Sequence, residues 1–336
     1  MNSPARWWSE VDGKVRCTLC PRHCSLREGQ RGFCFVRQNL GGQLMLTTYG
    51  RSSGFAVDPV EKKPLNHFFP GSTVLSFGTA GCNLACKFCQ NWELSTARSL
   101  DLMAAAATPE QIAALASGRG CRGVAYTYND PIIFAEYAID SASACREAGL
   151  VNIAVTAGYI EAEPRAEFFA AMDGANVDLK SFSDDFYRRL TGARLAPVKE
   201  TLVYLARETN VWLEITTLLI PGQNDSDAEI DALSAWVADA LGPHVPLHFT
   251  AFHPDNRMRD TPRTPAATLA RARHLAQANG LHFVYTGNIR DLEGATTYCP
   301  ACHAPLIIRD GFHVTQNTLT SGHCPHCAHP IAGRWM

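Results

Sequence analysis

Three cysteines stand within eight residues of one another in the segment GTAGCNLACKFCQNW, which runs from residue 78 to residue 92. Cys82, Cys86 and Cys89 have the spacing C-x3-C-x2-C, and the segment supplies no fourth cysteine and no histidine. Thiolates are the usual ligands of iron–sulfur clusters, and a [4Fe-4S] cluster normally takes four of them. Three thiolates therefore predict a [4Fe-4S] cluster with one iron left open to a small molecule. The alternative is a structural metal site that borrows a distant cysteine.

A second group of cysteines lies near the start of the chain, in the segment CTLCPRHCSLREGQRGFC. Its members are Cys17, Cys20, Cys24 and Cys34. Four thiolates with glycine and proline between them are enough to close one site. The number of ligands suits a structural zinc ion, but a second iron–sulfur cluster uses the same ligands. The sequence predicts a bound metal here and leaves both metals open.

A third group lies near the end of the chain, where two C-x2-C pairs are separated by 21 residues. Its members are Cys299, Cys302, Cys324 and Cys327. A proline follows the first cysteine of each pair, which favours a tight turn that presents two thiolates to one ion. We predict one zinc ion in a zinc-ribbon-like tail.

Composition indicates the cellular compartment of these thiols and excludes some classes of partner. The chain has 336 residues, 13 cysteines and a net charge of -2, so a broad basic surface for nucleic acid is not expected. The first residues hold no apolar run of the length that a signal peptide needs, and no apolar stretch is long enough to span a membrane. We therefore expect a cytoplasmic protein with no membrane partner. Clustered thiols in a reducing compartment more often bind metal than form disulfides.

Buried strands are predicted from residue 73 onward, where apolar and β-branched runs alternate with segments of helical length. The strand-like runs are 73–78, 123–128, 152–156, 176–180, 211–219, 247–252 and 282–287. Repeated strand–helix units imply a parallel sheet with right-handed crossovers. Their number favours an α/β fold with a partial (β/α) TIM-type barrel. We divide the chain into an N-terminal cysteine-rich segment over 1–70, the barrel over 71–290 and a C-terminal zinc-ribbon-like domain over 296–336.

Polar residues recur where the predicted strands end. The three-cysteine segment follows the first strand, Asn129 and Asp130 follow the second, and Asp178 and Lys180 close the fourth. Functional groups of a parallel barrel gather at the carboxyl ends of its strands. These residues are therefore predicted to share one mouth with the cysteines.

The cysteine spacing, with an aromatic residue before the last cysteine, resembles that of the radical S-adenosylmethionine (SAM) superfamily. Further segments narrow the resemblance to the group of pyruvate formate-lyase activating enzymes, and within it to the AmmeMemoRadiSam branch, across residues 15–290. The segments are VDPVEKKPLNHFFPGSTVLSFGTAGCNLACKFCQNW, YTYNDP, VDLKSF, TTLLIPGQND and HFTAFHPD. The resemblance implies that SAM chelates the open iron. One electron then cleaves the C5'–S bond, and the resulting 5'-deoxyadenosyl radical abstracts a hydrogen atom from a substrate.

The resemblance also implies roles for single residues. Asn129 and Asp130 match the motif that meets the SAM amino group, and Asp178 and Lys180 match the motif near the ribose and carboxylate. Phe88 matches the residue whose backbone lies along the adenine. No residue is assigned a catalytic role.

Two residues depart from the pattern of the family. A glutamate is expected where Asp130 stands, and an asparagine is expected where Ala157 stands, so Ala157 receives no role. The implied partners are an electron donor such as flavodoxin or ferredoxin, together with Ammecr-type and Memo-type proteins. The substrate is a protein or a small molecule that the sequence does not identify. The competing hypothesis is a non-enzymatic zinc-binding module that docks protein or nucleic acid.

Overall fold

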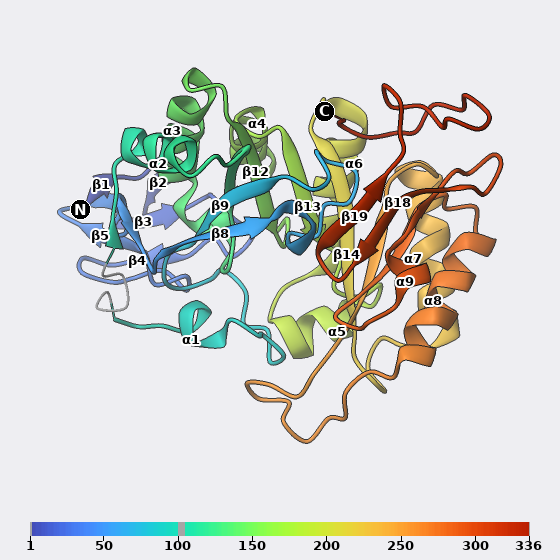
Figure 1. Cartoon of the computed structure of the whole chain (residues 1–336). Helices are drawn as coiled ribbons and strands as arrows, with labels where there is room; N and C mark the ends of the chain where they lie inside the picture. Colours follow the sequence, from blue (N-terminus) through green and yellow to red (C-terminus); the bar gives the residue numbers. More distant parts are fainter. Residues whose placement is uncertain (1, 100–104, 336) are drawn as a thin grey trace.

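A computed structural model describes residues 2–99 and 105–335 of the chain. Its centre is an eight-stranded sheet in the order β16-β15-β14-β13-β12-β11-β9-β8 (Figure 1). Seven strands are parallel and β8 pairs antiparallel with β9, and among the described residues β16 does not pair with β8. The prediction of a partial barrel is therefore confirmed. The strands are β8 Phe55–Pro59, β9 Thr73–Phe77, β11 Gly123–Tyr126, β12 Val151–Thr156, β13 Gly174–Asp178, β14 Trp212–Leu219, β15 Leu247–Ala251 and β16 Val284–Gly287.

All seven strands predicted from the apolar runs are present. Every residue of β11 and of β15 is buried, as expected for strands covered on both faces. The polar ends of the predicted runs extend beyond the paired strands, so Lys180 follows β13 rather than lying in it. This extension carries the polar residues into the loops above the sheet.

Helices cover the outside of the sheet. Thr108 caps α2 with a complete capping box to Gln111. Ser226 caps α7 through the Glu229 backbone N–H, but the Glu229 side chain instead accepts from Ser181 and Phe182. The longer helices are α2 Pro109–Gly118, α3 Ala135–Glu147, α4 Ala162–Ala170, α6 Leu195–Glu208, α7 Asp227–Ala240 and α8 Ala266–Ala278, and the short ones are α1 Trp92–Ser95, α5 Asp184–Phe186 and α9 Leu292–Ala295.

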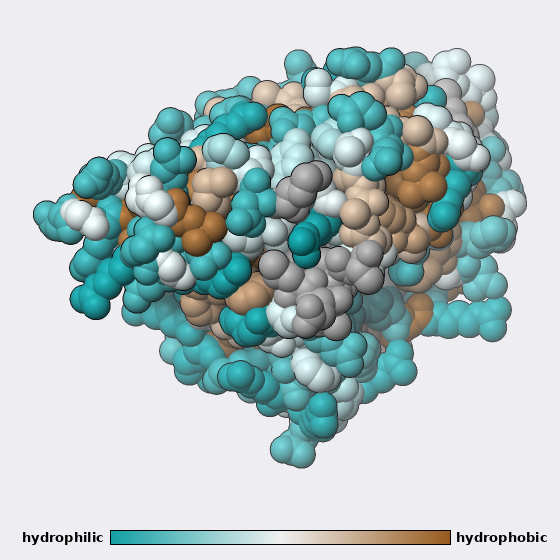
Figure 2. All heavy atoms as spheres, turned by 90° about the vertical axis from the view of Figure 1, so that its left-hand side faces the viewer, coloured by the Kyte–Doolittle hydropathy of each residue, from teal (hydrophilic) through white to brown (hydrophobic). Residues whose placement is uncertain are grey.

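The N-terminal segment forms two small antiparallel sheets beside the barrel, and Figure 2 looks onto this side of the molecule. Arg37 on β5 pairs with Glu136 on α3, and both side chains are almost fully buried. Because β8 belongs to the central sheet, the boundary placed at residue 70 does not separate the segment from the barrel. The small strands are β1 Ser3–Pro4, β2 Trp8–Val11, β3 Lys14–Cys17, β4 Ser25–Leu26, β5 Arg37–Leu40 and β6 Gln43–Leu46, and β7 Arg51–Ser52 pairs with β10 Ala105–Ala106.

The C-terminal tail forms its own sheet from β17 Thr297–Tyr298, β18 Pro305–Asp310 and β19 His313–Asn317. In Figure 1 this hairpin (red) and the small strands β1 to β5 (dark blue) lie on opposite sides of the molecule. The tail packs closely on the barrel. Cys299 and Cys324 share a hydrophobic cluster with Phe283 and Tyr285. The tail is a distinct sheet with an extensive interface, and its independent folding stays a prediction.

None of the helices in the described part of the chain has the length and apolar character needed to cross a membrane.

Candidate active site

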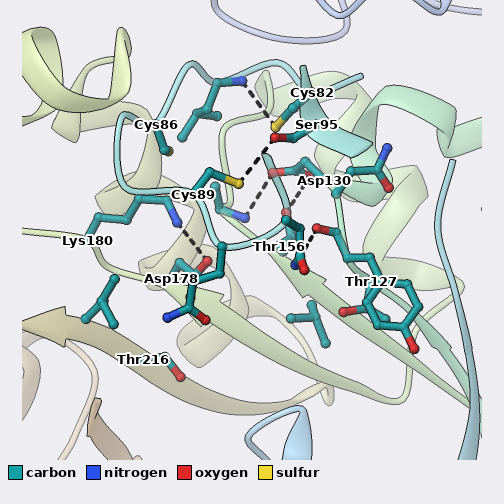
Figure 3. A pocket seen from close by; sticks show the side chains of 18 of the residues that line it. Cys82, Cys86, Cys89, Ser95, Thr127, Asp130, Thr156, Asp178, Lys180 and Thr216 are labelled. Carbon is teal, nitrogen blue, oxygen red and sulfur yellow. Dashed lines mark hydrogen bonds and ion pairs between the residues drawn. The ribbon is translucent and has the colours of Figure 1, made fainter. Parts of the chain in front are cut away.

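One pocket at the carboxyl ends of the strands brings together the site residues predicted for the barrel mouth (Figure 3). Cys82, Cys86 and Cys89 reach it from the loop after β9. The other predicted residues that line it are Phe88, Asn129, Asp130, Asp178 and Lys180. The pocket lining contains no fourth cysteine and no histidine. The donor set therefore fits a [4Fe-4S] cluster that has three protein ligands and one open iron.

The cysteine loop is held by hydrogen bonds from several parts of the chain. The Gly81 N–H donates to the Leu94 carbonyl (2.9 Å), and the Ala85 N–H donates to the Thr191 carbonyl (2.8 Å). Asn256 Nδ2 donates to the Cys86 carbonyl (3.1 Å). Contacts within the protein therefore fix the position of the loop.

The thiols themselves lie in an environment that disfavours free thiolates. Burial raises the pKa of Cys82 well above its ordinary value and raises the pKa of Cys86 to about 12, although Lys180 opposes the rise at Cys86. The Leu84 N–H donates to Cys82 Sγ (3.4 Å), and Ser95 Oγ lies 3.2 Å from Cys89 Sγ. Iron binding must therefore release protons from these groups.

The polar side-chain atoms of Asn129 form hydrogen bonds with other residues of the protein. Its Oδ1 accepts from the Thr79 N–H (3.1 Å), and its Nδ2 donates to Thr79 Oγ1 (3.1 Å) and the Gly81 carbonyl (2.9 Å). The residue after β11 thereby fixes the start of the cysteine loop. Its contact with the SAM amino group stays a prediction.

Asp130 is also engaged by neighbouring donors. Oδ1 accepts from Thr156 Oγ1 (2.8 Å) and the Ile132 N–H (3.1 Å), and Oδ2 accepts from the Ala157 N–H (3.0 Å). Burial raises the pKa of this carboxyl, and the three hydrogen bonds oppose the rise. The Asp130 side chain thereby joins the ends of β11 and β12. Its contact with SAM likewise stays a prediction.

Asp178 and Lys180 form an ion pair at the pocket wall, with Lys180 Nζ 2.8 Å from Asp178 Oδ2. Burial alone would lower the pKa of Lys180, but Asp178 and the Cys86 sulfur hold it above its ordinary value. Lys180 Nζ also lies 6.0 Å from the centre of the Phe88 ring. About a third of the Asp178 side chain is exposed, so its carboxylate can accept hydrogen bonds from hydroxyl groups. The ammonium of Lys180, which this ion pair fixes, can bind a carboxylate group.

The structure adds residues that sequence reasoning did not single out. Asp58 on β8 accepts from Lys62 (2.8 Å), Lys63 (2.7 Å) and the Tyr128 hydroxyl (3.0 Å), and Lys62 and Tyr128 line the pocket. Burial would raise the pKa of Asp58, but the two lysines lower it overall. The segment VDPVEKKP contains three of these residues, so a charged cluster just before the first predicted strand was the available signal.

A larger cavity continues from this pocket toward the C-terminal sheet. The two share Lys62, Asp178 and Asn288 in their linings, among others. Phe312 and Thr315 of the C-terminal hairpin form part of the far wall. The two hollows are therefore contiguous.

The four C-terminal cysteines converge on one point. Their sulfurs lie within 4.8 Å of one another, and the Cys299–Cys327 and Cys302–Cys324 sulfur pairs are 3.6 Å apart. Zn–S bonds of about 2.3 Å in a tetrahedron place sulfurs about 3.8 Å apart. The geometry fits the predicted zinc. The four N-terminal cysteines line a separate small pocket.

Comparison with known proteins gives a consistent classification. The family model described as the radical SAM superfamily matches residues 77–233. The chain is 41% identical over 322 residues to an uncharacterized protein of Methanocaldococcus jannaschii, covering 95% of this chain and 96% of that protein. It is 26% identical over 192 residues to the pyruvate formate-lyase 1-activating enzyme of Escherichia coli, covering 55% of this chain and 75% of that enzyme.

A solved structure of Streptococcus suis SuiB bound to S-adenosylmethionine has a TM-score of 0.50 at 15% identity. The structural match covers 68% of this chain and 53% of the SuiB chain. At 15% identity the likeness supports the fold alone.

The fold and the pocket define an α/β protein whose open barrel carries a cluster-binding loop at its mouth. The chain belongs to the radical SAM superfamily and is similar to the pyruvate formate-lyase activating enzymes. Membership indicates an enzyme that uses a [4Fe-4S] cluster and SAM, and it disfavours the hypothesis of a non-enzymatic zinc module.

Proposed function

We propose that this enzyme cleaves SAM reductively and abstracts a hydrogen atom from a second molecule held in the larger cavity. The observation that carries the proposal is the convergence of three cysteines, without a fourth, on a pocket that also holds Asp178 and Lys180. A [4Fe-4S] cluster held by Cys82, Cys86 and Cys89 would supply the electron for this cleavage.

The protein contributes positioning and shielding. Asp178 presents its carboxylate to the ribose hydroxyls, and Lys180 presents its ammonium to the SAM carboxylate. Asn129 and Asp130 act by fixing the cysteine loop and the strand ends. Bound SAM and substrate would exclude water from the pocket and so protect a reactive intermediate.

The substrate side is the cavity between the barrel and the C-terminal hairpin. It carries both charge signs, with Arg263, Arg290 and Asp310 in its lining. A mixed lining suits a polar small molecule or a peptide segment. An electron donor of the flavodoxin or ferredoxin class supplies the reductant, and Ammecr-type and Memo-type proteins are proposed partners.

The hydrogen-abstraction step can be tested without knowing the substrate. The cluster-loaded protein is incubated anaerobically with SAM, a reductant and extract from cells grown in deuterated medium. Abstraction from a carbon-bound position should give 5'-deoxyadenosine one mass unit heavier. If 5'-deoxyadenosine forms but never acquires deuterium in any extract fraction, the hydrogen-abstraction step is refuted.

The cavity can be tested with a matched pair of variants on β19. Thr315→Trp places a large side chain in the cavity, whereas Gln316 is exposed and absent from the cavity lining. Thr315→Trp should lower deuterium transfer while slow uncoupled SAM cleavage continues, and Gln316→Trp should leave both unchanged. Equal transfer by the two variants would place the substrate elsewhere.

A further inference from the structure

The four cysteines of the N-terminal segment, Cys17, Cys20, Cys24 and Cys34, line one small pocket. The Cys17 N–H donates to the Cys24 carbonyl (2.9 Å), and the His23 N–H donates to the Cys20 carbonyl (3.1 Å). These bonds close the loop between β3 and β4 and direct it toward the pocket. The chain has thus assembled a four-thiol site that the proposed SAM chemistry does not use.

The distances between sulfur atoms distinguish the C-terminal cysteine group from the other two groups. Among the described residues, only the C-terminal group holds three or more metal-ligating atoms that all lie within 4.8 Å of one another. Neither the N-terminal cysteines nor the loop cysteines that serve the SAM cluster converge in this way. A single zinc ion draws its ligands close together, whereas an iron–sulfur cluster spreads them over a larger body. The N-terminal site therefore resembles the cluster loop and differs from the zinc site.

The N-terminal pocket places a hydrogen-bond donor and arginine side chains beside its thiols. The Phe33 N–H donates to Cys24 Sγ (3.4 Å), a hydrogen bond of the kind that tunes cluster sulfurs. Arg37 is buried at the pocket wall and compensates thiolate charge there, while its guanidinium is fixed by Glu136. At Gly32, a Cβ would stand 3.8 Å from the sulfurs of both Cys24 and Cys34.

The pocket also lies directly behind the loop that binds the SAM cluster. A Cβ at Gly81 would stand 2.0 Å from the Cys34 carbonyl oxygen, and Gly81 has φ +82°, so only glycine permits this approach. Arg22 Nε donates to the Asn83 carbonyl, and both residues line the N-terminal pocket. The two sites are therefore joined through the residues on either side of Cys82.

From the sulfur spacing and this position, we propose that Cys17, Cys20, Cys24 and Cys34 bind a second [4Fe-4S] cluster, adjacent to the SAM cluster. All four of its irons are ligated by protein, so it offers no open position to SAM. Its place behind the cysteine loop suits one-electron transfer to the SAM cluster from a reduced flavodoxin or ferredoxin.

The test is the metal content of the anaerobically reconstituted full-length protein. The wild type should hold about eight iron, eight sulfide and one zinc per chain. A variant with Cys82, Cys86 and Cys89 all replaced by Ala should keep about four iron and four sulfide, with an electron paramagnetic resonance signal that SAM does not alter. Cys20→Ala/Cys24→Ala should keep about four iron with a signal that SAM alters.

A matched control is Cys121→Ala, because Cys121 is buried outside all three groups. It should retain the wild-type metal content. A triple variant with about two zinc and no iron would overturn the proposal. If that variant does not fold, a wild type with only four iron and two zinc would overturn it equally. Metal content is measured without SAM turnover, so the result is independent of the proposed reaction.

Discussion

Arg309 fastens the C-terminal sheet to the barrel and offers the sharpest test of that interface. Its side chain is 1% exposed and donates to the carbonyls of Asn66 (2.7 Å) and Ala295 (3.1 Å) and to Thr297 Oγ1 (2.9 Å). Nε lies 3.7 Å from the buried carboxylate of Glu61. Arg309→Met keeps much of the side-chain volume and removes the charge and every donor.

The expected cost follows from what stays buried. Removing one of the two residues of a buried ion pair costs about 3–5 kcal/mol because the charge of the other residue is left uncompensated. Here the Glu61 carboxylate remains and three acceptors lose their donor. Arg309→Met should therefore lower the free energy of opening the C-terminal sheet by about 3–5 kcal/mol, or roughly 100-fold or more in the opening equilibrium.

Arg290→Met is the matched control in the same region. Arg290 pairs with Asp310 at 3.2 Å, but its side chain is 86% exposed, and such pairs contribute about 0–1 kcal/mol. Hydrogen–deuterium exchange measured by mass spectrometry over β17 to β19 reports the opening of the sheet directly. Equal exchange rates in the Arg309 and Arg290 variants would refute the reasoning.

The loss should also depend on pH. Burial raises the pKa of Glu61, and Arg309 opposes the rise, so the pKa should rise further in Arg309→Met. The folded variant then binds more protons than the unfolded chain above the ordinary glutamate pKa, and its stability falls as pH increases. The defect should be larger at pH 8 than at pH 5, and adding Glu61→Gln should recover part of it at pH 8.

Three further predictions concern SAM, the loop and zinc. Asp178→Ala should raise the dissociation constant for SAM roughly 10- to 150-fold, since a lost hydrogen bond to a charged group costs about 1.5–3 kcal/mol. The control Asp185→Ala, at an exposed residue, should leave this constant unchanged. If cluster-loaded Asp178→Ala and wild-type protein have equal dissociation constants for SAM, Asp178 does not belong to the SAM site. Asp130→Ala should lower the free energy of unfolding in urea by about 1–3 kcal/mol for each buried donor left unpaired. Asp130→Asn should recover part of this loss. An unchanged urea midpoint in Asp130→Ala would show that the three hydrogen bonds to the Asp130 carboxylate contribute nothing to stability. Removing zinc with EDTA, with iron content verified as unchanged, should raise exchange over β17 to β19 and spare the central sheet; unchanged exchange would contradict a zinc-dependent tail.

The sequence allowed the parallel strands and the cysteine groups to be predicted because both signals are local. Buried parallel strands are apolar throughout, and metal-binding cysteines are separated by only a few residues. β8 was missed because Asp58 and Pro59 interrupt its apolar character and it joins the sheet only as an antiparallel edge strand. The small N-terminal strands have two to four residues and carry no periodic pattern.

Contacts between distant segments could not be predicted from local patterns. Tyr128 meets Asp58 across 70 positions, and Arg309 meets Asn66 across 243. The same limit applied to Asn129 and Asp130, which the motif assigns to SAM but whose polar atoms fix the loop and strand ends. The larger cavity likewise combines lining residues from the barrel and from the C-terminal hairpin, which are far apart in the sequence.

The central claim, reductive SAM cleavage by a cluster held on three cysteines, is tested most directly by 5'-deoxyadenosine formation. Wild-type protein and Cys145→Ala, whose buried thiol lies outside the cysteine groups, are compared with Cys86→Ala under anaerobic conditions with SAM and dithionite. The wild type and Cys145→Ala should form 5'-deoxyadenosine and methionine in equal amounts, and Cys86→Ala should form neither above background. Formation at the normal rate by Cys86→Ala, or none by the cluster-loaded wild type, would contradict the account.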